Sequence, residues 1–153
     1  MFEIRPDDLS SEATRSLIAL HLAGMHAASP PGTVFALDLS GLKVPEVTVW
    51  TAWKGASIAG IGALKMLSAE QAELKSMRTH PDFLRRGVAA LLLEHILGEA
   101  KRKGVKIVSL ETGSGPDFEA ALTLYRKRGF MEGNVFGDYV PSPFNQFFHL
   151  VLA

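Results

Sequence analysis

Apolar residues recur along this chain with two spacings, one typical of helices and one typical of strands. Helical spacing between Glu12 and Ala28 predicts a first helix, with Ser10 or Ser11 as its N-cap. Pro30 and Pro31 follow it and cannot continue a helix. Apolar residues from Leu84 onward predict a long second helix that ends in basic residues and a glycine, and residues 118–128 predict a third.

Shorter runs of β-branched, aromatic and other apolar residues predict the strands. Residues 47–53 and 58–67 form a predicted hairpin that turns at Lys54-Gly55, and residues 2–5 a short first strand. Residues 72–79 alternate, which predicts Glu73, Lys75, Met77 and Thr79 on one face. Residues 105–110 are typical of a buried parallel strand. Residues 134–139 and 146–152 predict two final strands, whereas residues 33–44 follow neither pattern.

These elements predict an α/β fold with a mixed, mostly antiparallel sheet of about seven strands flanked by helices. The strands at 72–79 and 105–110 are joined by a helix, so we expect a central parallel pair with a right-handed crossover. No linker or repeat divides the sequence. Residues 1–153 are therefore interpreted as one domain.

Composition narrows the functions that this fold could perform. The chain has 16 basic and 16 acidic residues, a balance that argues against a nucleic-acid binder. It has no cysteine, which excludes disulfides, thiolate metal sites and a cysteine nucleophile. No histidine pair has the spacing of a metal site, and no leader or membrane-spanning run is recognisable. We therefore expect a cytoplasmic protein that binds neither metal nor membrane.

The segment between the polar strand and the long helix has the features of an anion-binding turn. Leu84-Arg85-Arg86-Gly87-Val88-Ala89 would place unpaired main-chain N–H groups and two arginines at a helix start. A glycine and a small alanine would let a pyrophosphate approach the main chain. The alternative is that Gly87 and Ala89 serve helix–sheet packing and that the arginines are solvated.

Two motifs together resemble the GNAT superfamily of N-acetyltransferases. The first combines Glu73-Leu74-Lys75-Ser76-Met77-Arg78-Thr79 with the turn at 84–89, and the second is Leu124-Tyr125-Arg126-Lys127-Arg128-Gly129-Phe130. The sequences of residues 73–79, 109–113 and 29–31 are similar to those of a YsnE-like bacterial branch of that superfamily. The resemblance implies acetyl-CoA as co-substrate, with main-chain groups of 77–79 along its pantetheine arm. The cofactor-binding residues would be Met77, Arg78, Thr79, Leu84, Arg85, Arg86, Gly87, Val88, Ala89 and Ala90, although Leu84 stands where the family usually has glutamine or arginine.

The same resemblance suggests two catalytic residues. Glu73 occupies the position of a catalytic glutamate and would be the base, although an ion pair with Lys75 or Arg78 is the alternative. Tyr125 matches the tyrosine that protonates the departing thiolate, with a core position on its amphipathic helix as the alternative. Without cysteine, the acetyl group would pass directly to the amine in a ternary complex.

The acceptor is less well defined by the sequence. A small-molecule amine or a peptide is expected, with His26, Ser29 and Tyr139 as candidate acceptor-binding residues. The apolar C-terminal strand would allow a homodimer. A non-catalytic acyl-CoA-binding regulatory module is the alternative function, because a fold alone does not imply activity.

Overall fold

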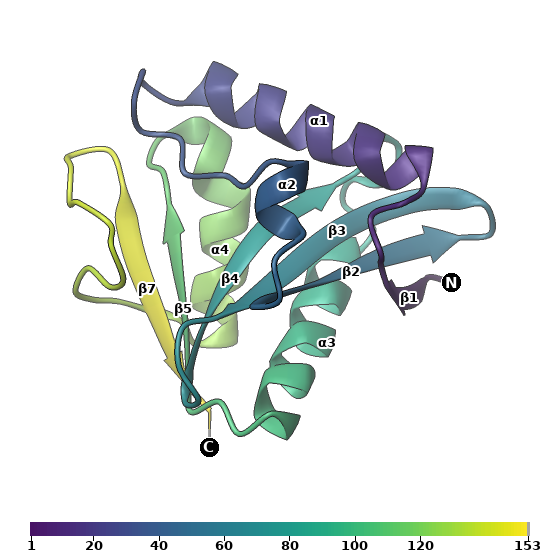
Figure 1. The fold of residues 1–153 in the computed structure, drawn as a ribbon. Coiled ribbons are helices and arrows are strands. Elements are labelled where there is room, and N and C mark those ends of the chain that lie inside the picture. The colour runs from purple at the N-terminus through teal and green to yellow at the C-terminus, as the bar shows by residue number, and fades with distance from the viewer. Residues whose placement is uncertain (153) are drawn as a thin grey trace.

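Seven strands form one open sheet in the computed structural model, which describes residues 1–152 (Figure 1). Their order is β1-β2-β3-β4-β5-β7-β6, and every neighbouring pair is antiparallel except β4 and β5. The predicted mixed sheet with one central parallel pair is thus confirmed. The strands are β1 (Glu3–Pro6), β2 (Val47–Lys54), β3 (Ser57–Met66), β4 (Gln71–Thr79), β5 (Ile107–Thr112), β6 (Met131–Glu132) and β7 (Gln146–Val151).

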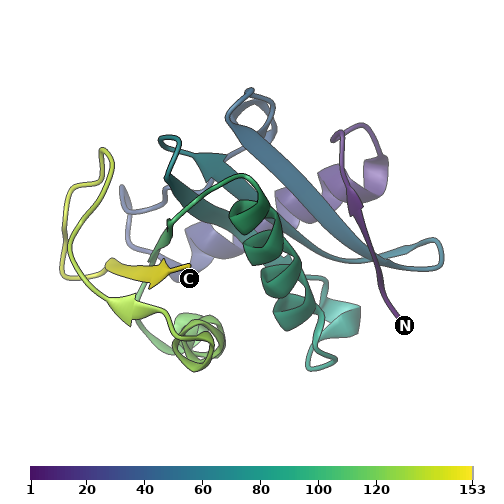
Figure 2. The same ribbon diagram turned by 90° about the horizontal axis from the view of Figure 1, so that it is seen from below.

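Helices cover both faces of the sheet (Figures 1 and 2). The helices are α1 (Glu12–Ala28), α2 (Leu39–Leu42), α3 (Val88–Arg102) and α4 (Glu119–Arg128), with short 3-10 turns η1 (Pro81–Phe83) and η2 (Pro116–Phe118). Apolar residues of α3 and α4 bury one face in a core that includes Leu92, Leu122 and Phe148. A second core, which includes Leu17 and Ile61, lies beneath α1 and α2. In the described part of the chain, no helix has the length and apolar character that crossing a bilayer requires.

A β-bulge in β4 changes which side chains share a face of that strand. Ala63 pairs with Lys75 but Ile61 pairs with Arg78, so β4 has one extra residue opposite Gly62. Ser76 lies at the bulge with a φ of 59°. Met77 therefore points to α3, where a Cβ on Gly62 would come within 2.6 Å of its Sδ. The predicted strict alternation over residues 72–79 is wrong beyond Ser76, and Arg78 shares the α1 face with Glu73 and Lys75.

The parallel strands β4 and β5 separate part-way along their length. They pair from Gln71 opposite Ile107 to Glu73 opposite Ser109, whereas β4 continues to Thr79 and β5 to Thr112. Figure 1 shows the two strands diverging, with α4 behind the space between them. The edge of β4 that faces β5 is thus unpaired beyond Glu73.

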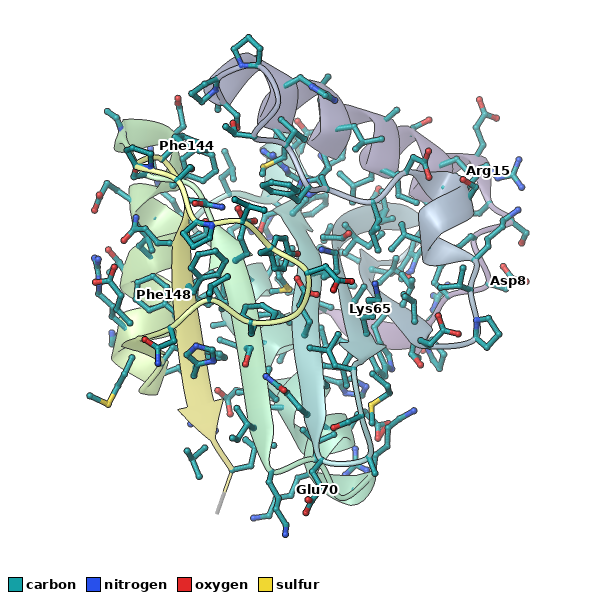
Figure 3. All side chains as sticks on the ribbon, turned by 60° about the vertical axis from the view of Figure 1, so that its left-hand side comes forward. Asp8, Arg15, Lys65, Glu70, Phe144 and Phe148 are labelled. Atoms are coloured by element: carbon teal, nitrogen blue, oxygen red, sulfur yellow. The ribbon has the colours of Figure 1, made fainter. Side chains whose placement is uncertain are left out.

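Three predicted elements differ from the structure. Residues 134–139 form no strand but lie in the loop between β6 and β7, which in Figure 3 crosses in front of β5 and β4. The long helix begins at Val88 rather than near Leu84, whose side chain is 57% exposed. The strand predicted at 105–110 is displaced to Ile107–Thr112. By contrast, α1 has the predicted bounds, and the side chain of Ser11 caps it by accepting from the Thr14 N–H at 3.1 Å.

Candidate active site

The start of α3 presents a row of unpaired main-chain donors. The first intrahelical bond runs from the Leu91 N–H to the Gly87 carbonyl at 3.0 Å, so the N–H groups of Val88, Ala89 and Ala90 have no partner within the helix. Gly87 precedes them with a φ of 82°, a backbone conformation that glycine adopts without strain. A Cβ at Gly87 would meet nothing within 4 Å, so its positive φ, rather than crowding, favours glycine here. This geometry suits a phosphate group.

The side chains of the turn before α3 are largely solvent-facing. Arg85 and Arg86 are exposed, and the Arg86 guanidinium lies over the rings of Phe2 and Phe83 at 5.7 and 5.2 Å. Arg85 has a positive φ of 61°, which turns the chain into the helix. Both arginines bring positive charge to the free N–H groups, whereas the exposed Leu84 adds none. The turn therefore offers unpaired main-chain donors and two exposed cations.

The unpaired edge of β4 carries a second set of main-chain groups. The His80 N–H donates to the Ala59 carbonyl at 2.8 Å, so by alternation the main chain of Arg78 also faces β3. The N–H and C=O groups of Met77 and Thr79 then point the other way, into the space between β4 and β5. Of the three residues predicted to pair with a pantetheine arm, Met77 and Thr79 have this orientation and Arg78 does not.

Glu73 lies in a tight polar cluster on the α1 face of the sheet. Its side chain is 5% exposed, and its Oε2 accepts from Lys75 Nζ at 3.1 Å and from the Tyr139 hydroxyl. Lys75 Nζ also donates to the Tyr139 hydroxyl at 2.8 Å and to the Phe35 carbonyl at 3.4 Å. The cluster joins β4 to the α1–α2 loop and to the β6–β7 loop. Burial and the charge of Glu73 raise the pKa of the Tyr139 phenol well above its ordinary value.

A second carboxylate, Glu111, lies beside this cluster and was not among the residues predicted from sequence. It is two residues beyond Ser109 on β5 and shares the face of Glu73. Burial raises the pKa of Glu111 to about 7; the charge of Glu73 acts in the same direction, while Lys75 and a hydrogen bond with Asn145 oppose the rise. The only signal in the sequence is a single glutamate at the end of an apolar strand.

Tyr125 lies on the other face of the sheet from Glu73 and Glu111. It lies on α4 within the core beneath α3 and α4, where its ring packs against Phe130 at 5.7 Å. The side chain is 6% exposed, and burial raises the pKa of the phenol above its ordinary value. None of the hydrogen bonds within residues 1–152 uses its hydroxyl. Tyr125 therefore has a core position, and its hydroxyl is still free to donate a hydrogen bond.

Of the three predicted acceptor-binding residues, only Tyr139 lies in the cluster with Glu73. Tyr139 lies in the cluster, His26 is exposed in the last turn of α1, and Ser29 follows that helix with a buried Oγ that has no partner in the described chain. His21 of α1 is buried and accepts from Arg78 Nε at 2.9 Å. In residues 1–152, no three histidine or acidic side chains are arranged to hold a metal ion.

The sequence matches proteins of one enzyme family. The model of the acetyltransferase (GNAT) family matches residues 14–130. The uncharacterised N-acetyltransferase YedL of Escherichia coli is 47% identical over 153 residues, which cover 100% of this chain and 96% of YedL. The uncharacterised N-acetyltransferase YsnE of Bacillus subtilis is 46% identical over 140 residues, which cover 92% of this chain and 93% of YsnE.

Solved structures share the fold at lower identity. A protein of Klebsiella pneumoniae assigned as an acyl-CoA N-acyltransferase superposes with a TM-score of 0.85 at 23% identity, covering 100% of this chain and 99% of its own. A GNAT-family acetyltransferase of Elizabethkingia anophelis, solved with acetyl-CoA bound, gives a TM-score of 0.66 at 17% identity, covering 99% and 98%.

Proposed function

Because this chain belongs to the acetyltransferase (GNAT) family, and is thus an acetyltransferase, we propose that it transfers acetyl from acetyl-CoA directly to an amine. One observation carries the proposal. Free N–H groups at the start of α3, the unpaired edge of β4 and the carboxylates Glu73 and Glu111 all belong to the part of the fold where β4 and β5 separate and α3 begins. An enzyme that transfers an acyl group from CoA to an amine must bind the CoA phosphates, hold the pantetheine arm and accept the amine proton near one another.

The residues that would hold acetyl-CoA lie on two adjoining elements. Main-chain N–H groups of Gly87, Val88, Ala89 and Ala90 would bind the pyrophosphate, with Arg85 and Arg86 nearby. The open groups of Met77 and Thr79 would pair with the amides of the pantetheine arm as an added strand does. The structural relative with bound acetyl-CoA supports this choice of co-substrate.

Proton removal from the amine falls to the carboxylates on the α1 face. A base whose pKa lies near neutrality can accept a proton at neutral pH and release it again, and Glu111 has such a pKa, about 7. Glu73 is held in place by Lys75 and Tyr139. We assign Glu73 and Glu111 together as the proton-accepting pair, in which Glu73 either accepts the proton itself or raises the pKa of Glu111 through its charge. The amine nitrogen forms the new N–C bond, the thioester C–S bond breaks, and the amine proton passes to this pair.

Protonation of the departing thiolate falls to Tyr125. The phenol is protonated at neutral pH and forms no hydrogen bond in the described chain, and its side chain lies on the other face of the sheet from the carboxylates. The base and the acid therefore approach the reacting carbon from opposite faces of the sheet. This arrangement keeps the two proton transfers apart.

Release of free thiol from acetyl-CoA, measured against a panel of amines, tests the proposal. We expect amine-dependent release that falls at least about tenfold in Tyr125→Phe and Glu111→Gln while affinity for CoA is retained. The pH profile of kcat/KM should lose an ionisation near neutrality in Glu111→Gln, and Glu73→Gln reports whether Glu73 acts as the base itself. CoA binding without turnover on any amine would refute the proposal and favour a non-catalytic acyl-CoA-binding module.

A further inference from the structure

Arg78 is a half-buried cation that forms no ion pair in the described chain. Its guanidinium lies on the α1 face of β4, where Nε donates to His21 Nδ1 at 2.9 Å and Nη2 to the His21 carbonyl at 3.5 Å. None of the ion pairs within residues 1–152 includes Arg78. Buried or half-buried arginines are usually paired with a carboxylate, so this one has unused binding capacity.

The neighbours of Arg78 hold it in one orientation. Burial, together with the charges of Arg78 and Lys75, lowers the pKa of His21 to about 4, so the ring stays neutral and can accept from Nε. A Cβ at Gly24 would lie 3.0 Å from Nη2, 3.3 Å from Nη1 and 3.4 Å from Cζ. These similar distances mean that the guanidinium plane lies across the backbone of α1 at Gly24. Nη1 makes no hydrogen bond in the described chain and Nη2 makes one long bond, so the outer edge of the fork is available.

Arg78 also differs from Lys75 on the same face. Lys75 has three donor hydrogens, and it already faces three acceptors in Glu73, Tyr139 and Phe35. Arg78 has donors to spare, and it projects to the face that holds Glu73 and Glu111; Lys65, which lies opposite Glu73 on β3, is a further cation on this face. Its own main chain pairs with β3, so its position in the cofactor motif does not commit the side chain to the cofactor.

Resting on the proposed function, we propose that the acceptor is an amine that also carries a carboxylate, and that Arg78 binds this carboxylate through the free edge of its guanidinium. Arg78 is then a specificity-determining residue. The planar guanidinium binds a carboxylate with two parallel hydrogen bonds, which an ammonium group cannot do. The carboxylate of the acceptor would also be the acidic partner that Arg78 lacks among the ion pairs of the described chain. The acceptor class is that of free amino acids and other small aminocarboxylates, rather than the interior amines of a protein.

Matched pairs of acceptors test the inference in the thiol-release assay. Each pair joins an α-, β- or γ-amino acid with the same molecule lacking the carboxylate or bearing a carboxamide in its place. We expect the wild-type enzyme to favour the acids by roughly 10- to 100-fold in kcat/KM, because a charge-assisted bidentate contact contributes on that scale. Arg78→Gln should abolish this preference by raising KM for the acids while leaving kcat/KM for the uncharged partners within about twofold.

Two further variants separate recognition from structure. Gly24→Ala keeps the arginine but places a methyl group against its guanidinium, and alanine favours a helix, so we expect reduced preference for acids in a folded protein. Arg78→Lys keeps the charge without the fork and should restore part of the preference. Arg102→Gln, at an exposed arginine that pairs with Glu99, is the matched control and should behave as wild type.

The outcomes distinguish this inference from the proposed function. No amine-dependent release with any acceptor would overturn the proposed acetyl transfer itself. Transfer to amines with no preference for the acids, or a better rate with peptides than with free amino acids, would overturn the role of Arg78 alone. An equal loss on both members of each pair in Arg78→Gln would also overturn it, because that pattern indicates a structural or cofactor-binding role.

Discussion

Replacing Glu111 with glutamine should make the protein more stable at alkaline pH, although it removes a proposed catalytic group. The ordinary pKa of a glutamate is 4.5, and burial raises that of Glu111 to about 7. Between these values the folded state keeps a proton that the unfolded state has released, so stability falls as pH rises. Below 4.5 the carboxyl is neutral in both states and contributes no penalty, and above 7 the penalty is complete.

The size of the effect follows from the two pKa values. Each pKa unit corresponds to about 1.36 kcal/mol, so ionisation of Glu111 costs the folded state roughly 3 kcal/mol by about pH 8. Glutamine is nearly isosteric and uncharged, so Glu111→Gln should gain most of that amount relative to wild type at about pH 8 and little at about pH 4.

Urea unfolding at the two pH values measures this difference directly. The exposed residue Glu46, changed to glutamine, controls for the loss of one surface charge. A difference between Glu111→Gln and wild type that is the same at both pH values would refute the reasoning, because the predicted gain comes entirely from ionisation of the buried carboxyl.

Three substitutions test the local geometry. Ser11→Ala removes the cap of α1 and should lower the free energy of unfolding by about 1 kcal/mol, read from chemical denaturation; no loss would mean that the Thr14 N–H finds another acceptor. Gly87→Ala puts a side chain at a φ of 82°, which should cost about 1–2 kcal/mol and weaken CoA binding in calorimetry; unchanged affinity would place the pyrophosphate elsewhere. Gly113→Ala would set a Cβ 2.7 Å from Phe118 Cζ and overlap the Phe144 ring, so thermal unfolding should show a loss of about 1–3 kcal/mol, and an unchanged Tm would contradict that packing.

The parts of the fold that sequence predicts well are those with local causes. Helix α1 has an apolar stripe, a serine cap and prolines after its end, so its bounds of Glu12–Ala28 follow from neighbouring residues alone. The hairpin of β2 and β3 and the crossover to β5 follow equally from strand pattern and chain connectivity. The start of α3 is an exception: apolar spacing predicts it near Leu84, whereas Gly87 takes a positive φ and the helix begins at Val88.

The parts that sequence misses depend on contacts between distant segments. The bulge at Ser76 is set by pairing with β3, and it moves Arg78 to the face of Glu73 although strict alternation predicts otherwise. The loop containing Tyr139 looks like a strand in sequence, but in the structure its tyrosine bonds to Lys75, 64 positions earlier. The raised pKa of Glu111 likewise arises from burial between β4, β7 and that loop, which no local pattern encodes.

The charges on the α1 face divide into a satisfied set and a free set. Glu73, Lys75 and the hydroxyl of Tyr139 bond to one another and together hold two loops over the sheet, so their binding capacity is largely used within the protein. Glu111, Arg78 and Lys65 lie outside this set; Glu111 is a carboxyl that titrates near neutrality, and Arg78 is a half-buried cation that forms no ion pair in the described chain. An aminocarboxylate carries the complementary pair of groups, an amine for Glu111 and a carboxylate for Arg78.

If both proposals hold, Glu111→Gln should chiefly lower kcat and Arg78→Gln should chiefly raise KM, because the first group acts on the reacting nitrogen and the second only on binding. A double variant should then combine the two losses nearly additively in free energy, whereas strong coupling would mean that the two side chains act on the same step.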